Sequence, residues 1–335
     1  MLRKHKDVTE IPKSQRYADD RPLLEKLFTE KVVRDKQNCN RKMGEAVWKG
    51  FVVRQGGPIQ DDKPLYRLYD GGGREIAYQE MLDRCVRSDV ILFGEIHDHP
   101  LVHRLQLDLT RDLFEIKKCD LMLGAEMLEA DNQLIVDEYL AGLINHEHLV
   151  KEAKVWENYD TDYRPLVDVA KEHGLRFIAT NIPRRYAGLV ARDGMKALER
   201  LSDEAKRSIA PLPIAFDLAT PGYQQAMEIG MAHGAHLDAR NFVAAQAVKD
   251  ATMAYFILKN RRPKDLFIHY NGDYHSKNCG GICWYLKRYD PGITVRTISS
   301  VSRDTPGFDD ECKGLADIVL VVPAAMERRS SSIPQ

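Results

Sequence analysis

Short apolar runs alternate along this chain with longer stretches whose apolar residues recur at helical spacing. Residues 90–93 form one such run, which is followed by Gly94, Glu95 and His97 and then by a helical pattern from Pro100. This run fits a buried parallel strand whose end delivers polar side chains to the edge of a sheet. Similar runs predict strands at 121–126, 175–180, 266–270, 293–301 and 318–322, separated by helices at 100–117, 131–140, 164–173, 237–258 and 282–289.

The alternation of strands and helices favours an α/β fold, with a parallel-rich β-sheet flanked by helices on both faces. A β-hairpin with a loose turn is expected at residues 65–78, around three consecutive glycines. Residues 191–236 break the alternation and predict an inserted helical subdomain or lid. The expected organisation is therefore an irregular arm over 1–60, an α/β domain over 61–325 and a polar tail over 326–335.

Composition, charge and missing motifs bear on the partners, the location and the chemistry of the protein. The 335 residues hold 49 Lys and Arg against 50 Asp and Glu, so the balanced charge does not favour nucleic acid or an anionic membrane as a partner. No apolar run approaches the roughly 20 residues of a transmembrane helix. The first 30 residues lack the apolar core of a signal peptide, which favours the cytoplasm for the chain as written. Dinucleotide-binding, Walker A and serine-hydrolase motifs are absent from the sequence.

Four predicted strands end in polar residues that an ordinary turn does not need. Because the carboxyl ends of parallel strands share one edge of a sheet, these residues are expected to converge on one crevice. They are Glu95 with His97, Glu126, Asn181, and Asp273 with His275.

Two of these strand ends share the pattern G-x-x-H, in Gly94-Glu-Ile-His97 and Gly272-Asp-Tyr-His275. Two histidines and a carboxylate commonly bind a divalent metal, and Glu95, Glu126 or Asp273 could act as general base toward a metal-bound water. A single G-x-x-H is more often a loop with a solvated histidine. Two of them at the ends of parallel strands, with a glutamate at a third, favour a functional site.

Other side chains near this edge have two interpretations each. Arg184 and Arg185 at a helix start suit carboxylate or phosphate groups, or form a solvated pair. Trp156, with Tyr159 and Tyr163, can stack on a flat ligand or anchor a loop. Three further sets are interpreted mainly as structural. His99 and His103 are expected to form exposed surface. Met227 and Met231 are expected in the core, and His233 and His236 are candidates to line a pocket. Cys279 and Cys283 are interpreted as buried thiols and not as a metal or redox site.

Taken together, these residues resemble the ChaN family of haem-binding proteins, in the superfamily that also holds the Tiki metallopeptidases and erythromycin esterase-like enzymes. The resemblance covers roughly residues 65–300. It rests on Ile91-Leu-Phe-Gly-Glu-Ile-His97, Gly124-Ala-Glu-Met127 with Asn132-Gln133, Tyr163-Arg-Pro165, Asn181-Ile-Pro-Arg-Arg-Tyr186, Gln246 through Asp250 to Thr252-Met-Ala254, and Gly272-Asp-Tyr-His275.

The resemblance implies haem binding tied to iron uptake, often in lipoproteins of the bacterial cell envelope. This chain departs from that pattern because it begins with no signal segment or lipidation cysteine. Tyrosine is a chemically reasonable ligand of ferric haem, and Tyr274 and Tyr186 are the candidates at the crevice. In Tiki-like relatives the two G-x-x-H histidines and the glutamate bind metal, which corresponds here to His97, Glu126 and His275.

Two functions therefore stay open. The first is a haem-binding protein for haem or iron uptake or trafficking. In it Tyr274, Tyr186, His97 or His275 would hold the iron, and Arg184 or Arg185 would meet the propionates. The second is a metal-dependent peptidase or esterase, with His97, Glu126 and His275 as ligands and Glu95 or Asp273 activating water. Haem or another small molecule is the expected ligand, and a homodimer is left open.

Overall fold

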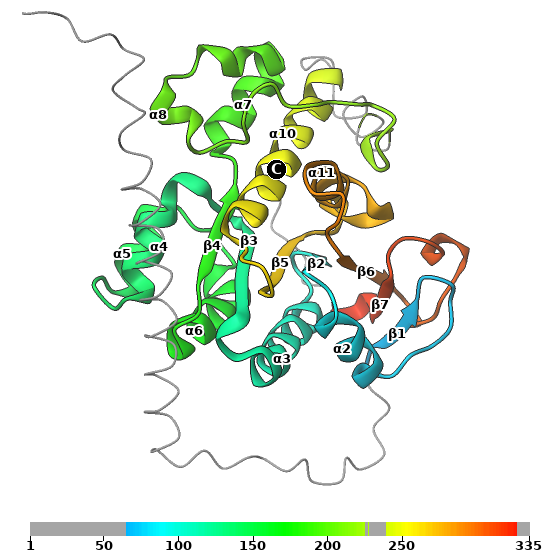
Figure 1. Ribbon diagram of the computed structural model, residues 1–335. Helices are drawn as coiled ribbons and strands as arrows, with labels where there is room; N and C mark the ends of the chain where they lie inside the picture. Colours follow the sequence, from blue (N-terminus) through cyan, green and yellow to red (C-terminus); the bar gives the residue numbers. More distant parts are fainter. Residues whose placement is uncertain (1–64, 225–226, 228–238, 327–335) are drawn as a thin grey trace, which may run out of the picture. The chain divides into compact units, whose positions relative to one another are not determined.

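The computed structural model describes residues 65–224, 227 and 239–326, which fold around one β-sheet (Figure 1). The seven strands of this sheet lie in the order β1-β7-β6-β2-β5-β3-β4. The edge strand β1 runs antiparallel to β7, and all other neighbours are parallel. The strands are β1 (Arg67–Asp70), β2 (Val90–Glu95), β3 (Leu121–Glu129), β4 (Phe177–Asn181), β5 (Leu266–Gly272), β6 (Val295–Arg303) and β7 (Ile318–Pro323).

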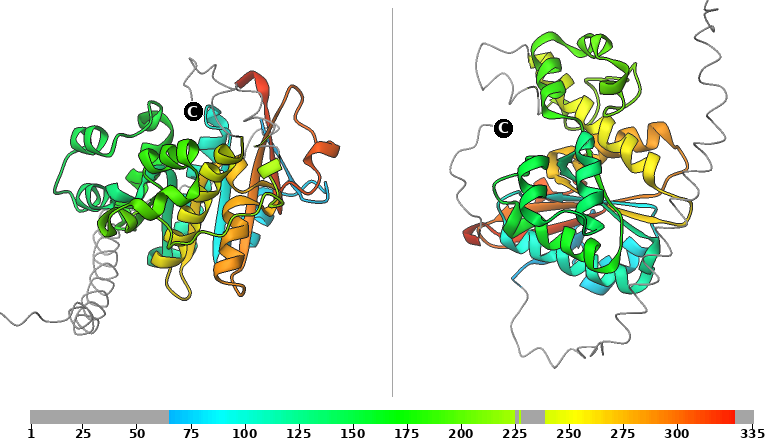
Figure 2. Two further views of the ribbon diagram at one scale, coloured as in Figure 1. Left: turned by 90° about the horizontal axis from the view of Figure 1, so that it is seen from above. Right: turned by 90° about the vertical axis from the view of Figure 1, so that its left-hand side faces the viewer.

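Helices cover both faces of the sheet (Figure 2). On one face α3 contacts β2, β3 and β5, with α2 and α6 beside it; on the other, α10 packs against β4, α7 and α11. The helices are α2 (Tyr78–Val86), α3 (Pro100–Lys117), α4 (Gln133–Leu140), α5 (His146–Ala153), α6 (Arg164–His173), α7 (Arg184–Asp193), α8 (Asp203–Lys206), α10 (Ala239–Asn260) and α11 (Gly281–Tyr289).

The side chains of β2 are buried on both faces of the sheet. Val90 and Leu92 are fully buried in the cluster that α7, α10 and α11 complete, whereas Ile91 and Phe93, also fully buried, alternate to the α3 face. A strand covered on both faces has no polar position until it ends. Its first polar side chains are therefore delivered together, at its carboxyl end.

The order of the strands brings the two G-x-x-H segments side by side. After β2 the chain forms β3 and β4, returns to insert β5 between β2 and β3, and then places β6 on the other side of β2. In the register of β2 and β5, Gly94 lies opposite Asn271 and Glu95 lies opposite Gly272. The two histidines that end these segments thus leave neighbouring strands near a reversal of strand order, where open α/β sheets bind ligands.

The predicted fold class is confirmed, and α3 has the bounds that the periodicity of its apolar residues predicted. The predicted hairpin at 65–78 is confirmed only in part: Tyr69 and Glu75 form an isolated antiparallel bridge around the turn, and the longer pairing of β1 is with β7. The Asp70 carboxylate accepts hydrogen bonds from the backbone N–H groups of Gly72 and Arg74, which tightens the turn. Because α2 begins at Tyr78, too few residues remain for a second strand.

Several predictions concern residues that the structure does not describe. The arm over 1–60, most of the tail, and Met231, His233 and His236 lie outside the described residues. Within the region of the predicted insertion, residues 195–200 and 203–206 are helical, and Leu198, Ile209 and Ile214 are buried in the core beside α10. Among the residues that the structure describes, no helix is long and apolar enough to cross a membrane.

A buried histidine in β5 predicts a loss of stability in mild acid. His269 is fully buried, with Nε2 2.7 Å from Thr180 Oγ1, and burial lowers its pKa to about 4 from an ordinary 6.5. The unfolded chain therefore takes up this proton first, so stability is lost as the pH falls from 6.5 towards 4. The shift corresponds to at most about 3 kcal/mol.

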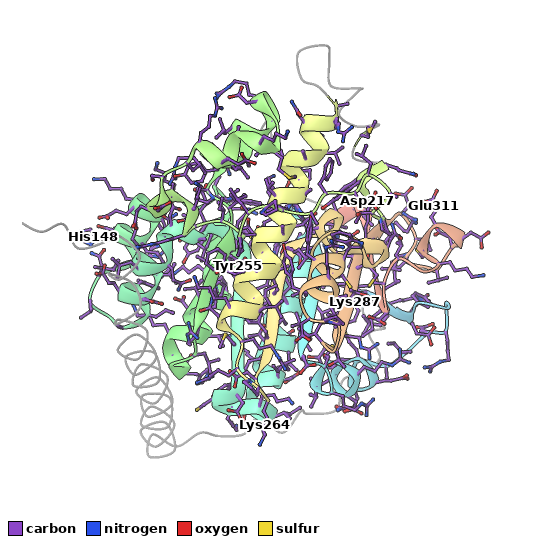
Figure 3. The ribbon with its side chains drawn as sticks, turned by 45° about the horizontal axis from the view of Figure 1, so that its top comes forward. His148, Asp217, Tyr255, Lys264, Lys287 and Glu311 are labelled. Atoms are coloured by element: carbon purple, nitrogen blue, oxygen red, sulfur yellow. The ribbon has the colours of Figure 1, made fainter. Side chains whose placement is uncertain are left out.

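Urea unfolding across this pH range checks the prediction. We expect His269→Asn to be less stable near neutral pH but to show a smaller decrease in stability on acidification than the unmodified chain. His148→Asn, at an exposed position of α5 (Figure 3), should keep the full decrease. Equal decreases in His269→Asn and the unmodified chain would assign the acid sensitivity to other groups.

Candidate functional site

Three predicted site residues meet at the carboxyl edge of the sheet: Glu126 in β3, His97 just after β2 and His275 after β5. Glu126 Oε1 lies 3.2 Å from His275 Nε2. Its other oxygen, Oε2, accepts a 2.8 Å hydrogen bond from the backbone N–H of Gly272. A Cβ atom built on Gly272 would lie 2.7 Å from His97 Nε2 and 3.5 Å from Glu126 Oε2. The absence of a side chain at Gly272 therefore lets His97 approach the carboxylate.

Each histidine is held from behind by a buried carboxylate. His97 Nδ1 lies 2.9 Å from Glu95 Oε1, and His275 Nδ1 lies 2.5 Å from Asp250 Oδ1. These bonds fix the ring orientations and leave the Nε2 atoms on the side of Glu126. In this arrangement the two imidazoles and one carboxylate can share protons or present lone pairs to a ligand.

The cluster is held together by charge. Burial opposes ionisation of Glu126, but His275, His97 and Lys249 outweigh it and hold the pKa of that carboxyl far below its usual range. Burial also opposes protonation of His275, yet Glu126 and Asp250 raise its pKa to about 10. The pKa of His97 is raised as well, against its burial, by Glu95 and then Glu126. The site is therefore a buried carboxylate whose negative charge is balanced by protonated histidine.

Glu95, predicted as a general base, has both oxygens occupied. Besides His97, it accepts hydrogen bonds from the Tyr163 hydroxyl at 2.7 Å and from Gln106 Nε2 at 2.6 Å. It is fully buried, and although burial favours its neutral form, nearby His103 and His97 lower its pKa. Glu95 therefore orients His97 and stays charged.

Asp273, the other predicted base, is directed away from this cluster. A Cβ atom built on Gly94 would lie 2.5 Å from Asp273 Oδ1, which places the carboxyl beneath β2 and beside β6. Burial raises its pKa to about 6, and the nearby Ser299, Lys277 and Ser300 oppose the shift. Asp273 thus lies next to the trio and is not part of it.

The aromatic loop after α5 supports the site. The Trp156 ring meets His97 edge-on, with centroids 5.1 Å apart, and Asn158 Nδ2 donates to the His97 carbonyl oxygen at 3.1 Å. Tyr159 and Tyr163 are buried in a π-helical turn, so they anchor the loop and do not stack on a ligand. Trp156 is partly exposed.

The expectation that His99 and His103 form exposed surface is wrong. Both are buried: His99 Nε2 lies 2.9 Å from the Pro323 carbonyl oxygen, and His103 Nε2 lies 2.8 Å from the His97 carbonyl oxygen. Each histidine therefore secures the backbone around β2. The i, i+4 spacing alone could not distinguish these buried positions from a solvated pair.

The predicted haem-contact residues lie on two segments that follow β5 and β4. Tyr274 is 52% exposed, with Lys277 Nζ 3.6 Å from its ring centroid. Tyr186, in the first turn of α7, is partly buried, and Arg185 Nη2 donates to its hydroxyl at 3.3 Å. Arg185 also pairs with Asp131 at 2.6 Å, whereas Arg184 is exposed.

Sequence reasoning missed the residues behind His275. Asp250 lies fully buried on α10, and the Tyr223 hydroxyl donates to its Oδ2 at 2.7 Å. An aspartate among apolar residues of a long helix was the available signal, but nothing in its spacing indicated a histidine partner. Within the described residues, no group of three His, Cys, Asp or Glu has a geometry that could hold a metal ion as it stands.

The close approach at Gly272 predicts that an added methyl group disrupts the trio. In Gly272→Ala the new Cβ would contact His97 Nε2, so we expect the imidazole to move away from Glu126 and the free energy of unfolding to fall by about 1–3 kcal/mol. Urea unfolding measures the stability, and the imidazole resonances of the histidines report the displacement.

The matched control is Gly188→Ala on α7, where an added Cβ meets nothing within 4 Å. This variant should keep the histidine spectrum and the stability of the unmodified chain, or gain slightly through helix propensity. An unchanged histidine spectrum in Gly272→Ala would contradict the described approach of His97.

A protein-family model and several solved structures are similar to this chain. The family model described as "Haem-binding uptake, Tiki superfamily, ChaN" matches residues 81–286. The structure "Cofacial heme binding to ChaN of Campylobacter jejuni" is similar with a TM-score of 0.58 at 18% identity, covering 76% of this chain and 96% of that one. At this identity the similarity shows a shared fold.

Two more distant structures were also found. A mutant of the erythromycin esterase EreC in its open conformation has a TM-score of 0.41 at 11% identity, covering 71% of this chain and 77% of that one. The type III effector HopBA1 has the same TM-score and identity, covering 72% and 91%. A search of curated proteins found no significant match.

Proposed function

The chain belongs to the ChaN family of haem-binding uptake proteins in the Tiki superfamily, and from this premise we propose that it binds haem at the carboxyl edge of its sheet, in haem or iron uptake or trafficking. Haem binding requires three features of a protein surface: a ligand for the iron, side chains that cover a flat apolar ring, and cations that pair with two carboxylates. Residues around this edge offer each of them.

The observation that carries the proposal is a cation placed against each of the two candidate tyrosines. Lys277 Nζ lies over the Tyr274 ring, and the Arg185 guanidinium lies 4.4 Å from the Tyr186 ring centroid and bonds to the hydroxyl. A tyrosine oxygen is a suitable ligand for ferric haem iron. Both tyrosines thus fit the ligand role by chemistry, and experiment must choose between them.

The other requirements of haem are met by neighbouring groups. Trp156 offers an indole ring beside His97, whose side chain is 26% exposed, so the imidazole is the more accessible of the two site histidines. Arg184 is exposed at the start of α7 and can meet a propionate without breaking another ion pair, whereas Arg185 is already paired with Asp131. We therefore assign Arg184 the propionate role.

A second function has a specific observation in its favour. The Nδ1 atoms of His97 and His275 are each bonded to a buried carboxylate, which is how proteins orient metal-binding histidines. His97, Glu126 and His275 are donors of the types that a divalent cation takes, although they do not form a metal site as they stand. Such an ion would supply Lewis-acid chemistry for hydrolysis of a peptide or ester. Neither predicted base faces the trio, since Glu95 is bonded to His97 and Asp273 lies beside Gly94 and β6.

Titration with haemin tests the haem proposal. We expect a saturable shift of the Soret band with the unmodified chain. Removal of the hydroxyl ligand, by Tyr274→Phe or Tyr186→Phe, should change the ferric spectrum and weaken binding about tenfold or more, equivalent to about 1.4 kcal/mol. Tyr289→Phe, at a partly exposed tyrosine on α11, is the matched control and should bind as the unmodified chain does.

The outcomes separate the two parts of the proposal. Unchanged spectra and affinities in both phenylalanine variants would rule out tyrosine as the ligand. A spectrum of the unmodified chain identical to that of free haemin would overturn haem binding itself.

Metal analysis tests the second function. If the site is a hydrolytic metal centre, chain incubated with Zn²⁺ and then desalted should retain a stoichiometric ion, and His97→Ala combined with His275→Ala should lose it. His148→Ala is the control, because this histidine is exposed on α5. Stoichiometric metal in the double variant would contradict the assignment of these ligands.

A further inference from the structure

Two cysteines in unlike environments lie at the start of α11. Cys279 lies before the helix and is exposed, whereas Cys283 lies within the first turn and is fully buried. The prediction of two buried thiols is therefore wrong for Cys279. The two side chains are close enough for the Cys283 thiol to affect the ionisation of Cys279. We call residues 279–283 the dithiol turn.

A lysine from the next turn of the helix completes the arrangement. Lys287, labelled in Figure 3, lies four residues beyond Cys283 and donates from Nζ to Cys279 Sγ at 3.1 Å. The neighbouring Cys283 thiol and the Lys287 ammonium, against partial burial, lower the pKa of Cys279 to about 6. Cys283 is affected in the opposite sense: the neighbouring Cys279 and burial raise the pKa of Cys283 well above the ordinary value.

The other thiols that the structure describes lack this combination. Cys85 is fully buried, and burial raises its pKa to about 12. Cys312 is also buried, and burial raises its pKa as well. An exposed sulfur that receives a hydrogen bond from an ammonium, with a second thiol nearby, is the arrangement of a reactive cysteine. A buried thiol beside it has the place of a resolving cysteine.

We propose that Cys279 and Cys283 form a peroxide-sensitive dithiol, in which Cys279 is the nucleophile and Cys283 the resolving group. The Cys279 thiolate attacks one oxygen of a hydroperoxide and becomes a sulfenic acid. The other oxygen leaves with a proton as an alcohol, or as water when the oxidant is hydrogen peroxide. The Cys283 sulfur then attacks the sulfenic sulfur, and loss of its proton with the hydroxyl group releases water and leaves a disulfide. The two thiols are oxidised and the peroxide is reduced.

The dithiol turn also packs tightly against the candidate site. Gly281 adjoins the carbonyl oxygen of His275, and a Cβ atom built on it would lie 3.0 Å from Asp250 Oδ2. On its other side, Gly280 adjoins the Pro221 carbonyl group, in the segment that leads to Tyr223. A disulfide across the turn therefore acts on the backbone that supports His275 and Asp250.

Peptide mapping of the full chain tests the proposal directly. Trypsin should release residues 278–287 as one peptide that contains both cysteines, since cleavage follows Lys277 and Lys287. After reduction, desalting and exposure to limiting hydrogen peroxide, we expect this peptide to lose the mass of two hydrogen atoms. In Cys283→Ser the sulfenic acid should persist at Cys279 and be captured by dimedone, while Cys85 and Cys312 stay reduced in both proteins.

The role of Lys287 is tested by the rate of alkylation with iodoacetamide. Lys287→Met keeps the length of the side chain but removes the charge, and a rise of about one pKa unit would slow alkylation of Cys279 about fivefold near pH 6. Arg288→Met, which removes the neighbouring charge on α11, is the control and should leave the rate unchanged. Equal rates in Lys287→Met and the unmodified chain would overturn the activation of Cys279.

Two further results would overturn the proposal. One is a peptide that stays fully reduced when Cys85 or Cys312 is already oxidised, because the order of reactivity would then be reversed. The other concerns the link to the site: the imidazole resonances of His275 should shift on oxidation of the unmodified chain and not in Cys283→Ser. Formation of the disulfide without that shift would overturn the link.

Discussion

A carboxylate buried at the end of β3 determines the arrangement of the whole carboxyl edge. Glu126 is 5% exposed, and a charge so far from water is stable only when it is paired and hydrogen-bonded. It obtains a backbone N–H from Gly272 and an imidazole from His275, with His97 nearby. Since Glu126 and these partners come from three adjacent strands, the strand order β2-β5-β3 is a condition of the site.

The carboxylates behind the two histidines meet the same requirement that buried charges be paired. Imidazoles beside a buried carboxylate carry positive charge, and Glu95 and Asp250 balance it. Both acids are themselves secured by tyrosine hydroxyls, Tyr163 for Glu95 and Tyr223 for Asp250. The cluster therefore forms two parallel relays, each running from tyrosine through acid to histidine, that converge on Glu126. Removal of any one member leaves a buried charge without its partner, so the effects of substitutions will not be additive.

The relays bear on both of the ligands proposed for this edge. Histidines with a fixed Nδ1 partner can present Nε2 to a metal ion, and the same fixed edge can form one wall of a binding surface for a planar molecule. What distinguishes the two uses is the surroundings of the edge. The exposed Tyr274 and Arg184 and the ring of Trp156 suit a large anionic ligand, and a small substrate of a hydrolase would not need them. Membership of a haem-binding family agrees with this preference.

The sequence by itself determined the parts of this protein that depend on neighbouring residues. Periodicity set the bounds of α3, apolar runs located the buried strands, and polar strand ends indicated an edge where Glu126 and the two histidines could meet. The tertiary structure decided which groups face one another. Glu95 became a partner of His97, Asp250 that of His275, and β1 joined β7 across most of the chain's length. Lys287 likewise selected Cys279 over Cys283 as the reactive thiol. Hydrophobic periodicity reports only whether a position is covered, whereas a charge or hydrogen-bond partner depends on distances that are fixed when the chain packs.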